Sequence, residues 1–382
     1  MRRRRNGWAV HALAVMAVLV GVAGCGGGGA PSAGVAAAES SPPPLPSSSG
    51  GVTSSGAASA AASSPAASAA PTPSPAAGGS VVVPVTLAPS TVAALDGALI
   101  ATVQITVGGG APVTVRLDTG SSGLLLASGA AGPGTTDTGR AVSTEFGGST
   151  ASGTLGQAVV ELGGVSTAAP IGVTLVDTSA GAPGTFAGTD GMLGVGTGNS
   201  STTAAGDVYA PTLQLPGTAA QGVTLDLTGS GGGTMTLGPV TAPAGATVLP
   251  MSRMTGTPAT YPNGAVGYDR LVSLCWTVGT APNACAPTDL DLGNPVFGLN
   301  ATTFASLGAL DTFLPAGQAV SISAPGAAAP LWSTTSAAPA SPEALLLTGL
   351  GDATYNTGIG LFQRAVVGID YAAGRFVVQP AG

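Results

Sequence analysis

The chain of 382 residues contains no lysine and only one histidine, because all ten of its basic residues are arginine. The single histidine, His11, lies in an N-terminal segment that we expect to be removed. Without His or Lys, the rest of the chain cannot form a Ser-His-Asp relay, a Cys-His pair, a lysine Schiff base or a histidine-ligated zinc site. Any chemistry that this protein performs must therefore rest on carboxylates.

Charge is also scarce, since charged residues make up 7% of the chain and aromatic residues only 4%. Four of the ten arginines, Arg2–Arg5, lie in the N-terminal segment. This leaves six arginines (10 − 4) against all 17 acidic residues, and a net charge of −11 (6 − 17). Such a balance offers no basic patch to a nucleic acid or to anionic lipid. We therefore expect no nucleic-acid partner.

The N-terminal residues have the three parts of a bacterial export signal. Arg2–Arg5 form the positive region, Trp8–Ala23 the apolar region, and Val22-Ala23-Gly24-Cys25 supplies small residues before a cysteine. This tetrad resembles the lipobox of bacterial lipoproteins, which implies removal of the signal peptide 1–24 and acylation of Cys25. We then expect an extracytoplasmic protein, at the cell surface or in the periplasm, bound to a membrane through its lipid alone. The alternative is an ordinary secretory signal with a chance cysteine.

Residues 25–80 consist almost entirely of Gly, Ala, Ser and Pro, with Glu39 as the only charged residue. A segment of this composition cannot bury enough apolar surface to offset the entropy that folding removes. We expect it to be a disordered tether between the membrane and the folded part of the chain. About 300 residues remain after it, which is ample for one large domain or two lobes.

Beyond residue 80 the pattern is that of β-strands. Runs such as Ile100–Val107 and Gly222–Leu227 alternate apolar and polar residues, are rich in Val and Thr, and are bounded by turn residues. One helix is expected at Ala301–Leu310, and Trp276 and Phe297 are expected in the core. The pattern predicts a mostly β protein.

The two cysteines that follow the tether are Cys275 and Cys285. They lie on strand-like runs on either side of the turn-prone stretch Thr280–Asn283. In an oxidising compartment, such a pair is most simply a disulfide that clamps a hairpin. A metal or redox pair is disfavoured, because the spacing is not that of a Cys-x-x-Cys motif and no third ligand is apparent.

Two aspartates stand in similar settings, 173 residues apart (291 − 118). The alternating run Val113–Leu117 leads into the loop Asp118-Thr119-Gly120-Ser121-Ser122, and Pro287–Leu290 leads into Asp291-Leu292-Gly293-Asn294. Each half also ends in an apolar-Gly element, Gly191–Gly194 in the first and Thr357–Gly360 in the second. This predicts two similar lobes that each contribute one aspartate to a shared cleft. The alternative is a chance recurrence of Asp-x-Gly in a chain with 62 glycines.

Taken in chain order, these segments resemble the pepsin family of aspartic peptidases over residues 90–380. Leu117–Leu124 is similar to the first catalytic loop of that family, and Asp291–Leu307 occupies the place of the second loop and the helix after it. The flap hairpin, an Asp-Gly strand and the C-terminal strands of the family are resembled by Phe146–Gly156, Asp190–Gly196 and Phe362–Pro380. The resemblance implies a bilobal pepsin-like fold with a cleft between two pseudo-symmetric β-lobes, 81–205 and 206–382.

The resemblance also assigns the chemistry. Asp118 and Asp291 become a catalytic pair that shares one proton, because two carboxylates a hydrogen bond apart cannot both ionise. The ionised member takes a proton from a bound water as the water attacks the scissile carbonyl, and the protonated member donates to the developing oxyanion, then to the leaving amine. No metal or organic cofactor is needed. The supporting residues that the resemblance implies are Thr119, Gly120, Ser121, Gly293 and Asn294 in the two loops, and Phe146, Gly147 and Gly148 in the flap.

Four positions depart from the pattern of that family. Leu292 stands where the family has Thr or Ser, so one of the two hydroxyls that brace the loops against each other is missing. Asn294 replaces the following Ser or Thr, and we expect its amide to hydrogen-bond Asp291. Phe146 replaces the flap tyrosine, and Leu125 replaces the tryptophan that usually receives the hydrogen bond of that tyrosine.

Three further side chains near the loops have expected partners or roles. Ser121 is expected to hydrogen-bond Asp118 and so to hold it in place. Asp289 points to the same side of its strand as Asp291 and is therefore a competitor for the catalytic role. Arg116 is expected to pair with carboxylates or backbone carbonyls at a sheet surface.

Two hypotheses follow, both for a monomer whose partner is a polypeptide. The first is a membrane-anchored aspartic endopeptidase that cleaves an extended substrate. The second is a catalytically inactive pepsin-fold lipoprotein that binds peptides or surface partners. Leu292 and Asn294 in the second loop favour the inactive form, whereas the intact first loop, 118–122, favours the enzyme.

Overall fold

The computed structural model describes residues 79–91, 97–146, 149–179, 186–198, 206–255, 260–349 and 354–381. The predicted signal peptide, the lipidated Cys25 and nearly all of the predicted tether lie outside these residues, as do Gly147 and Gly148 of the predicted flap. The predicted boundary between the lobes, after residue 205, also falls in an undescribed stretch. Among the described residues, no helix combines the length and apolar character that crossing a membrane requires.

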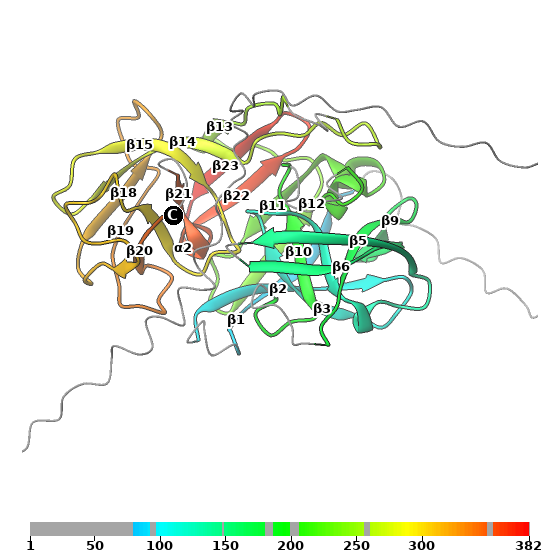
Figure 1. Ribbon diagram of the computed structural model, residues 1–382. Coiled ribbons are helices and arrows are strands. Elements are labelled where there is room, and N and C mark those ends of the chain that lie inside the picture. Colours follow the sequence, from blue (N-terminus) through cyan, green and yellow to red (C-terminus); the bar gives the residue numbers. More distant parts are fainter. Residues whose placement is uncertain are drawn as a thin grey trace, which may run out of the picture. The chain divides into compact units, whose positions relative to one another are not determined.

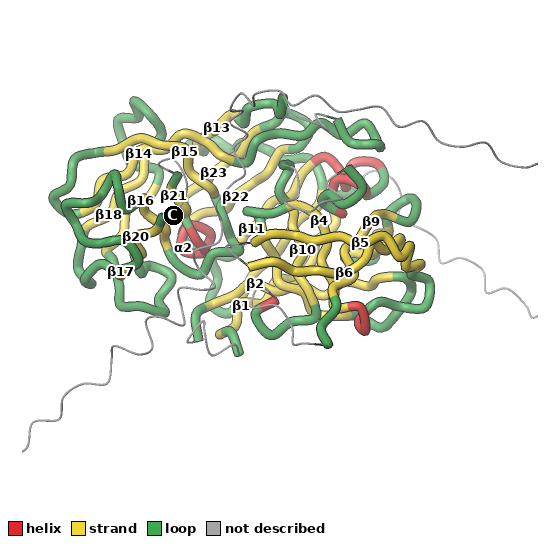
Figure 2. The backbone as a smooth tube through the Cα atoms, viewed as in Figure 1, coloured by secondary structure: helices red, strands yellow, loops and turns green. Residues whose placement is uncertain are grey.

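Strands and connecting loops make up almost all of the described chain, and helices are few and short (Figures 1 and 2). The described helical segments are three 3-10 helices, η2 (Ser128–Ala130), η4 (Pro211–Gln214) and η5 (Gly217–Gln221), and one α-helix, α2 (Gly358–Phe362). The mostly β, bilobal fold that the sequence predicts is therefore confirmed.

The larger sheet has 15 strands, in the order β13-β23-β22-β11-β12-β1-β2-β3-β10-β4-β9-β6-β5, with β7 paired to β2 and β8 paired to β7. Its strands are β1 (Val81–Pro89), β2 (Leu99–Val107), β3 (Val113–Asp118), β4 (Ser122–Ala127), β5 (Thr136–Phe146), β6 (Ser149–Ala158), β7 (Val160–Leu162), β8 (Val165–Ser166), β9 (Ile171–Val176), β10 (Gly191–Val195), β11 (Gly222–Asp226), β12 (Gly232–Leu237), β13 (Thr247–Pro250), β22 (Ala365–Asp370) and β23 (Arg375–Pro380). The C-terminal strands β22 and β23 thus join the same sheet as β1.

The smaller sheet has eight strands, in the order β17-β20-β16-β21-β15-β14-β18-β19. They are β14 (Leu271–Val278), β15 (Ala284–Asp289), β16 (Phe297–Asn300), β17 (Thr312–Phe313), β18 (Ala319–Ser323), β19 (Trp332–Thr335), β20 (Leu345–Thr348) and β21 (Tyr355–Asn356). All of them come from one continuous part of the chain, between residues 271 and 356.

The two sheets contain the same local arrangement around each aspartate. In the larger sheet, β10 lies between β3, with which it is parallel, and β4, with which it is antiparallel. In the smaller sheet, β21 lies in the same way between β15 and β16. Each loop that carries an aspartate connects two strands with a third strand between them, so the loop crosses the end of that third strand. The repeat that the sequence predicts is thus present in the strand pairing.

One hydrophobic cluster contains buried residues from both sheets. Trp276 and Phe297 belong to it, as expected, and neither is exposed to solvent. The Trp276 ring meets the edges of Phe297 and Tyr355, with ring centroids 6.0 Å and 5.6 Å away. Such edge contacts add to the free energy of burial of these large side chains. The loops that carry the aspartates therefore rest on a continuous core.

The prediction of a helix at Ala301–Leu310 is wrong, because the segment forms successive turns. The Asn300 side chain accepts hydrogen bonds from the backbone N–H groups of Thr302 and Thr303, which opens a turn. The N–H of Leu307 then bonds to the Phe304 carbonyl, three residues back. Two β-branched threonines and the glycine that follows Leu307 disfavour a regular helix here.

The disulfide predicted between Cys275 and Cys285 is confirmed. The two cysteines stand directly opposite each other on β14 and β15, with their Cα atoms 3.8 Å apart. The bond therefore fixes the register of the hairpin whose second strand leads into Asp291.

Candidate active site

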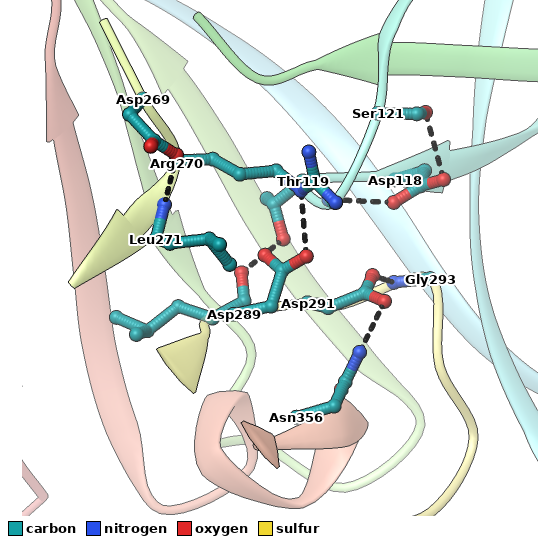
Figure 3. Close-up of polar contacts among 12 residues, drawn as sticks. Asp118, Thr119, Ser121, Asp269, Arg270, Leu271, Asp289, Asp291, Gly293 and Asn356 are labelled. Atoms are coloured by element: carbon teal, nitrogen blue, oxygen red, sulfur yellow. Dashed lines mark hydrogen bonds and ion pairs between the residues drawn. The ribbon is translucent and has the colours of Figure 1, made fainter. Parts of the chain in front are cut away.

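Asp118 is the last residue of β3 and is 8% exposed. Its two carboxyl oxygens each accept a hydrogen bond from its own loop (Figure 3). The N–H of Gly120 donates to Oδ1 at 2.7 Å, and the hydroxyl of Ser121 donates to Oδ2 at 2.8 Å. The hydrogen bond predicted between Ser121 and Asp118 is thus present. These bonds fix the direction in which the carboxyl group points.

Asp291 follows β15 by two residues and is 2% exposed. The N–H of Gly293 donates to its Oδ1 at 2.7 Å, which repeats the bond between Gly120 and Asp118. Its Oδ2 accepts a hydrogen bond of 2.7 Å from the side-chain amide of Asn356, on β21 (Figure 3). Both carboxyl groups are therefore held by one backbone donor and one side-chain donor.

The expectation that the Asn294 amide hydrogen-bonds Asp291 is wrong. Asn356 makes the hydrogen bond to Asp291, and the buried Oδ1 of Asn294 has no partner among the described residues. Asn294 instead contributes its backbone carbonyl, which accepts from Ile359 at 2.7 Å and so ties the loop to α2. The only signal for Asn356 in the sequence is its place just before the Thr357–Gly360 element.

Each carboxyl group packs against the glycine of the opposite loop. A Cβ atom at Gly120 would lie 2.5 Å from Cγ of Asp291, and one at Gly293 would lie 2.4 Å from Oδ1 of Asp118. Any side chain at these two positions would therefore collide with an aspartate. Glycine is required because the loops approach closely. The reciprocal contact brings together two residues that are 173 positions apart (291 − 118).

The Thr119 hydroxyl links the two loops on one side. It donates to the Leu290 carbonyl at 2.7 Å and accepts from the N–H of Leu292 at 2.8 Å. The second loop offers nothing equivalent, because Leu292 carries no hydroxyl and its side chain is buried in the core. The brace is thus one-sided, as the sequence predicts.

Arg116 makes a second link, which the sequence did not reveal. Its guanidinium donates to the backbone carbonyl of Gly293, and the residue is only 6% exposed. The expected carbonyl partner is therefore found, but Arg116 lies inside the molecule rather than at a sheet surface. Burial lowers the pKa of Arg116, whereas the charges of Asp118 and Asp291 raise it. A sequence signal existed, since alternation along β3 places Arg116 on the same face as Asp118.

The pKa of Asp291 is raised well above its ordinary value. Burial is the largest cause, followed by the negative charges of Asp118 and Asp289, and a hydrogen bond with Asp118 acts in the same direction. The hydrogen bond from Asn356 opposes the shift, because it stabilises the ionised form. A raised pKa of this origin is what a carboxyl group beside a second, buried carboxyl group shows.

The model of the PE-PGRS C-terminal aspartyl peptidase-like domain family matches residues 89–377, which is most of the chain. The chain belongs to this family. Among solved structures, it is similar to the aspartic proteinase from Irpex lacteus, with 15% sequence identity and a TM-score of 0.55. The similarity covers 80% of this chain and 98% of that one, and at this identity it establishes the fold. The comparison with curated proteins found no match.

Within this aspartyl peptidase-like domain, Asp289 has a partner of its own. It is 2% exposed and forms an ion pair with Arg270, whose Nε lies 2.6 Å from Oδ2 (Figure 3). Burial raises the pKa of Asp289 to about 6, although the charge of Arg270 acts to lower it. Asp289 packs against no glycine of the first loop, so Asp291 is the better counterpart of Asp118.

The predicted flap of this domain corresponds to a hairpin of β5 and β6, in which Phe146 stands opposite Ser149 (Figure 1). Leu125 on β4 stands where the pepsin family has a tryptophan. It is 1% exposed and packs in a small cluster with Ala151 on β6 and Met192 on β10. The site of the missing hydrogen-bond partner is therefore filled by an apolar contact that joins the flap strand to the sheet.

The first loop of the domain also packs against β10 and the residue that follows this strand. The N–H of Gly196 donates to the Ser121 carbonyl at 2.8 Å. A Cβ at Gly194 would lie 2.7 Å from the Ser121 hydroxyl oxygen. The glycines of the Asp190–Gly196 segment thus let this strand pass close under the loop that holds Asp118.

Proposed function

We propose that this protein is an aspartic endopeptidase in which Asp118, Asp291 and a water molecule hydrolyse peptide bonds. The observation that carries the proposal is the reciprocal packing of each carboxyl group against the glycine of the other loop. Two carboxyl groups in such proximity share one proton and titrate as a pair. The hydrogen bonds from the two loops then orient that pair for acid and base work.

The roles of the two aspartates follow from their surroundings. Asp291 holds the shared proton, because its burial and its acidic neighbours raise its pKa. Asp118, which accepts hydrogen bonds from Gly120 and Ser121, acts as the base that removes a proton from the attacking water. Asp291 then donates its proton to the oxygen of the tetrahedral intermediate. As the C–N bond breaks, Asp118 passes the proton that it took from water to the leaving amine, and a hydroxyl of the intermediate returns a proton to Asp291 as the carboxylic acid forms.

The substrate class is a polypeptide in extended conformation. Strand edges offer backbone donors and acceptors to such a chain, and the β5–β6 hairpin is the element that would cover it. The anchoring of the enzyme outside the cytoplasm, through acylated Cys25, belongs to the same proposal. Replacing Cys25 by Ala should move the protein from the membrane fraction to the soluble fraction, and an unchanged membrane fraction would contradict the anchor.

Cleavage of denatured casein and of a peptide library across pH 3 to 7 tests the proposed activity. We expect the wild-type chain to cleave, pepstatin to inhibit, and Asp118→Ala to be inactive. Asp137→Ala is the matched control, because the exposed side chain of Asp137 accepts a hydrogen bond from the N–H of Gly139, two residues on. Equal cleavage by wild type and Asp118→Ala would refute the proposal.

A second candidate function is peptide binding without cleavage. The one-sided link between the loops favours it, since Leu292 cannot supply the hydroxyl that pepsin-like sites use. The same peptide library distinguishes the two functions. Saturable binding of a labelled peptide, together with no cleavage at any pH, would establish the binding role.

A further inference from the structure

The cross-links between the two loops all come from the first loop and its strand. Thr119 bonds to the backbone on both sides of Asp291, and Arg116 bonds to the carbonyl of Gly293. Leu292, at the position that corresponds to Thr119, is buried in the core. Arg116 therefore supplies a second bond to the second loop, which receives none from the side chain at position 292.

We propose that Arg116 is a positioning residue that holds the second aspartate loop against the first, in place of the hydroxyl that Leu292 lacks. Its effect on catalysis rests on the proposed peptidase function. Its effect on the link between the loops does not, and can be measured separately.

The position of Gly293 explains why this hydrogen bond matters. Gly293 donates its N–H to Asp291 and at the same time packs against the carboxyl group of Asp118. Gly293 therefore contacts both members of the pair, and a shift of this residue changes the distance between them. Arg116 fixes the carbonyl of this residue from β3, a strand whose other face is locked in the core through Val115 and Leu117.

The charge of Arg116 has a second consequence. The carboxyl groups that act on it are Asp118 and Asp291, and Asp291 is also acted on by Asp289, which is paired with Arg270. A buried positive charge favours the ionised form of neighbouring carboxyl groups. Removing it should move both limbs of the pH profile of kcat/KM to higher pH, provided that the second arginine, Arg270, remains in place.

The test is a cycle of four chains: wild type, Arg116→Met, Leu292→Thr and the double variant. Full-length chains are compared for kcat, KM and thermal unfolding midpoint. By the symmetry of the loops, a hydroxyl introduced at position 292 can bond to the Leu117 carbonyl and the N–H of Thr119. We expect Arg116→Met to lower kcat about 100-fold with little change in KM, as for a misplaced catalytic group. In the Leu292→Thr background, the loss should be at least about tenfold smaller.

Arg116→Lys separates position from charge, because lysine keeps the positive charge but lacks the planar fork of arginine. We expect it to retain the wild-type pH profile while losing part of kcat. Arg116→Met should show the shift to higher pH. If Arg116→Met fails to fold, Arg116→Lys in the two Leu292 backgrounds gives the same comparison. A wild-type kcat and pH profile in the folded Arg116→Met chain would overturn the proposal.

The unfolding midpoints keep this proposal separate from the proposed function. If wild type cleaves nothing, the peptidase function fails, and the cycle of midpoints still decides the role of Arg116. A smaller drop for Arg116→Met in the Leu292→Thr background than in wild type supports a shared brace. Strictly additive drops would refute it.

Discussion

The two aspartate loops are alike in backbone and different in side chains. In both, the glycine two residues after the aspartate donates its N–H to the carboxyl group, at 2.7 Å. The side-chain donor comes from within the first loop, as Ser121, but from a separate strand in the second, as Asn356. Two residues before the aspartate stands Arg116 in the first half and Asp289 in the second.

The two loops are therefore symmetric in their backbone hydrogen bonds to the aspartates, whereas the side-chain bonds that join one loop to the other are not symmetric. Thr119 and Arg116 both reach from the first half to the backbone of the second. The position of Asp291 therefore depends on side chains that belong to the other half. The predictions below test this dependence, beginning with the largest effect.

Replacing either carboxyl group should abolish activity, whatever the differences between the loops. We expect Asp118→Asn and Asp291→Asn each to lower kcat/KM by about 1000-fold, because each variant removes a general acid or base. Peptide cleavage assays measure this, with Asp137→Asn as the control. Substantial activity in one of the two variants would show that a single carboxylate suffices.

Breaking the link at Thr119 should have the next largest effect. Thr119→Val keeps the shape of the side chain but leaves the Leu290 carbonyl and the Leu292 N–H without their partner. We expect kcat to fall about 100-fold, and the free energy of unfolding to fall by about 1–3 kcal/mol. Thr136→Val, at an exposed threonine of β5, is the matched control. Equal effects of the two substitutions would contradict the brace.

The raised pKa of Asp291 gives a prediction for stability. A carboxyl group whose pKa is raised on folding stabilises the protein fully below its unfolded pKa, and this contribution is lost as the pH rises through the folded value. In Asp291→Asn this carboxyl group is replaced by an amide that does not ionise, so the variant does not lose stability in this way as the pH rises. As the pH rises from 4 to 7, the free energy of unfolding of the variant should therefore increase relative to that of wild type. Denaturant unfolding at both pH values measures it, and a constant difference would contradict the account.

The smallest expected effect compares two asparagines. Asn356→Ala removes the hydrogen bond that stabilises ionised Asp291, so the pKa of Asp291 should rise further and the alkaline limb of kcat/KM should move to higher pH. We expect a decrease of about fivefold in kcat/KM, which corresponds to one ordinary hydrogen bond. Asn294→Ala should leave the alkaline limb in place. A shift of this limb in Asn294→Ala but not in Asn356→Ala would instead assign the hydrogen bond to Asp291 to Asn294.

The sequence predicted those features that depend on local pattern. Alternating Val and Thr predicted the strands, the spacing of Cys275 and Cys285 predicted the disulfide, and the intact loop around Asp118 predicted the Ser121 bond. The features that it missed depend on contacts between distant segments. Asn356 is 65 residues from Asp291, and Arg116 is 177 residues from Gly293. Their side chains are ordinary in sequence and acquire a role only through the pairing of β21 with β15 and the meeting of the loops.

The failed helix at Ala301–Leu310 has a different cause. Its apolar spacing was compatible with a helix, and the resemblance to the pepsin family reinforced that expectation. The side chain of Asn300 instead captures the N–H groups of Thr302 and Thr303, and the segment continues as turns. Local competition for backbone donors decided the outcome, which apolar periodicity alone does not report.

The central claim is that Asp118 and Asp291 share one proton. A neutron crystal structure of the protein near pH 5 measures it most directly, because it shows both the separation of the carboxyl groups and the position of hydrogen. We predict carboxyl oxygens within hydrogen-bond distance and one proton between them. Carboxyl groups more than about 5 Å apart, each with its own protonation state, would contradict the account.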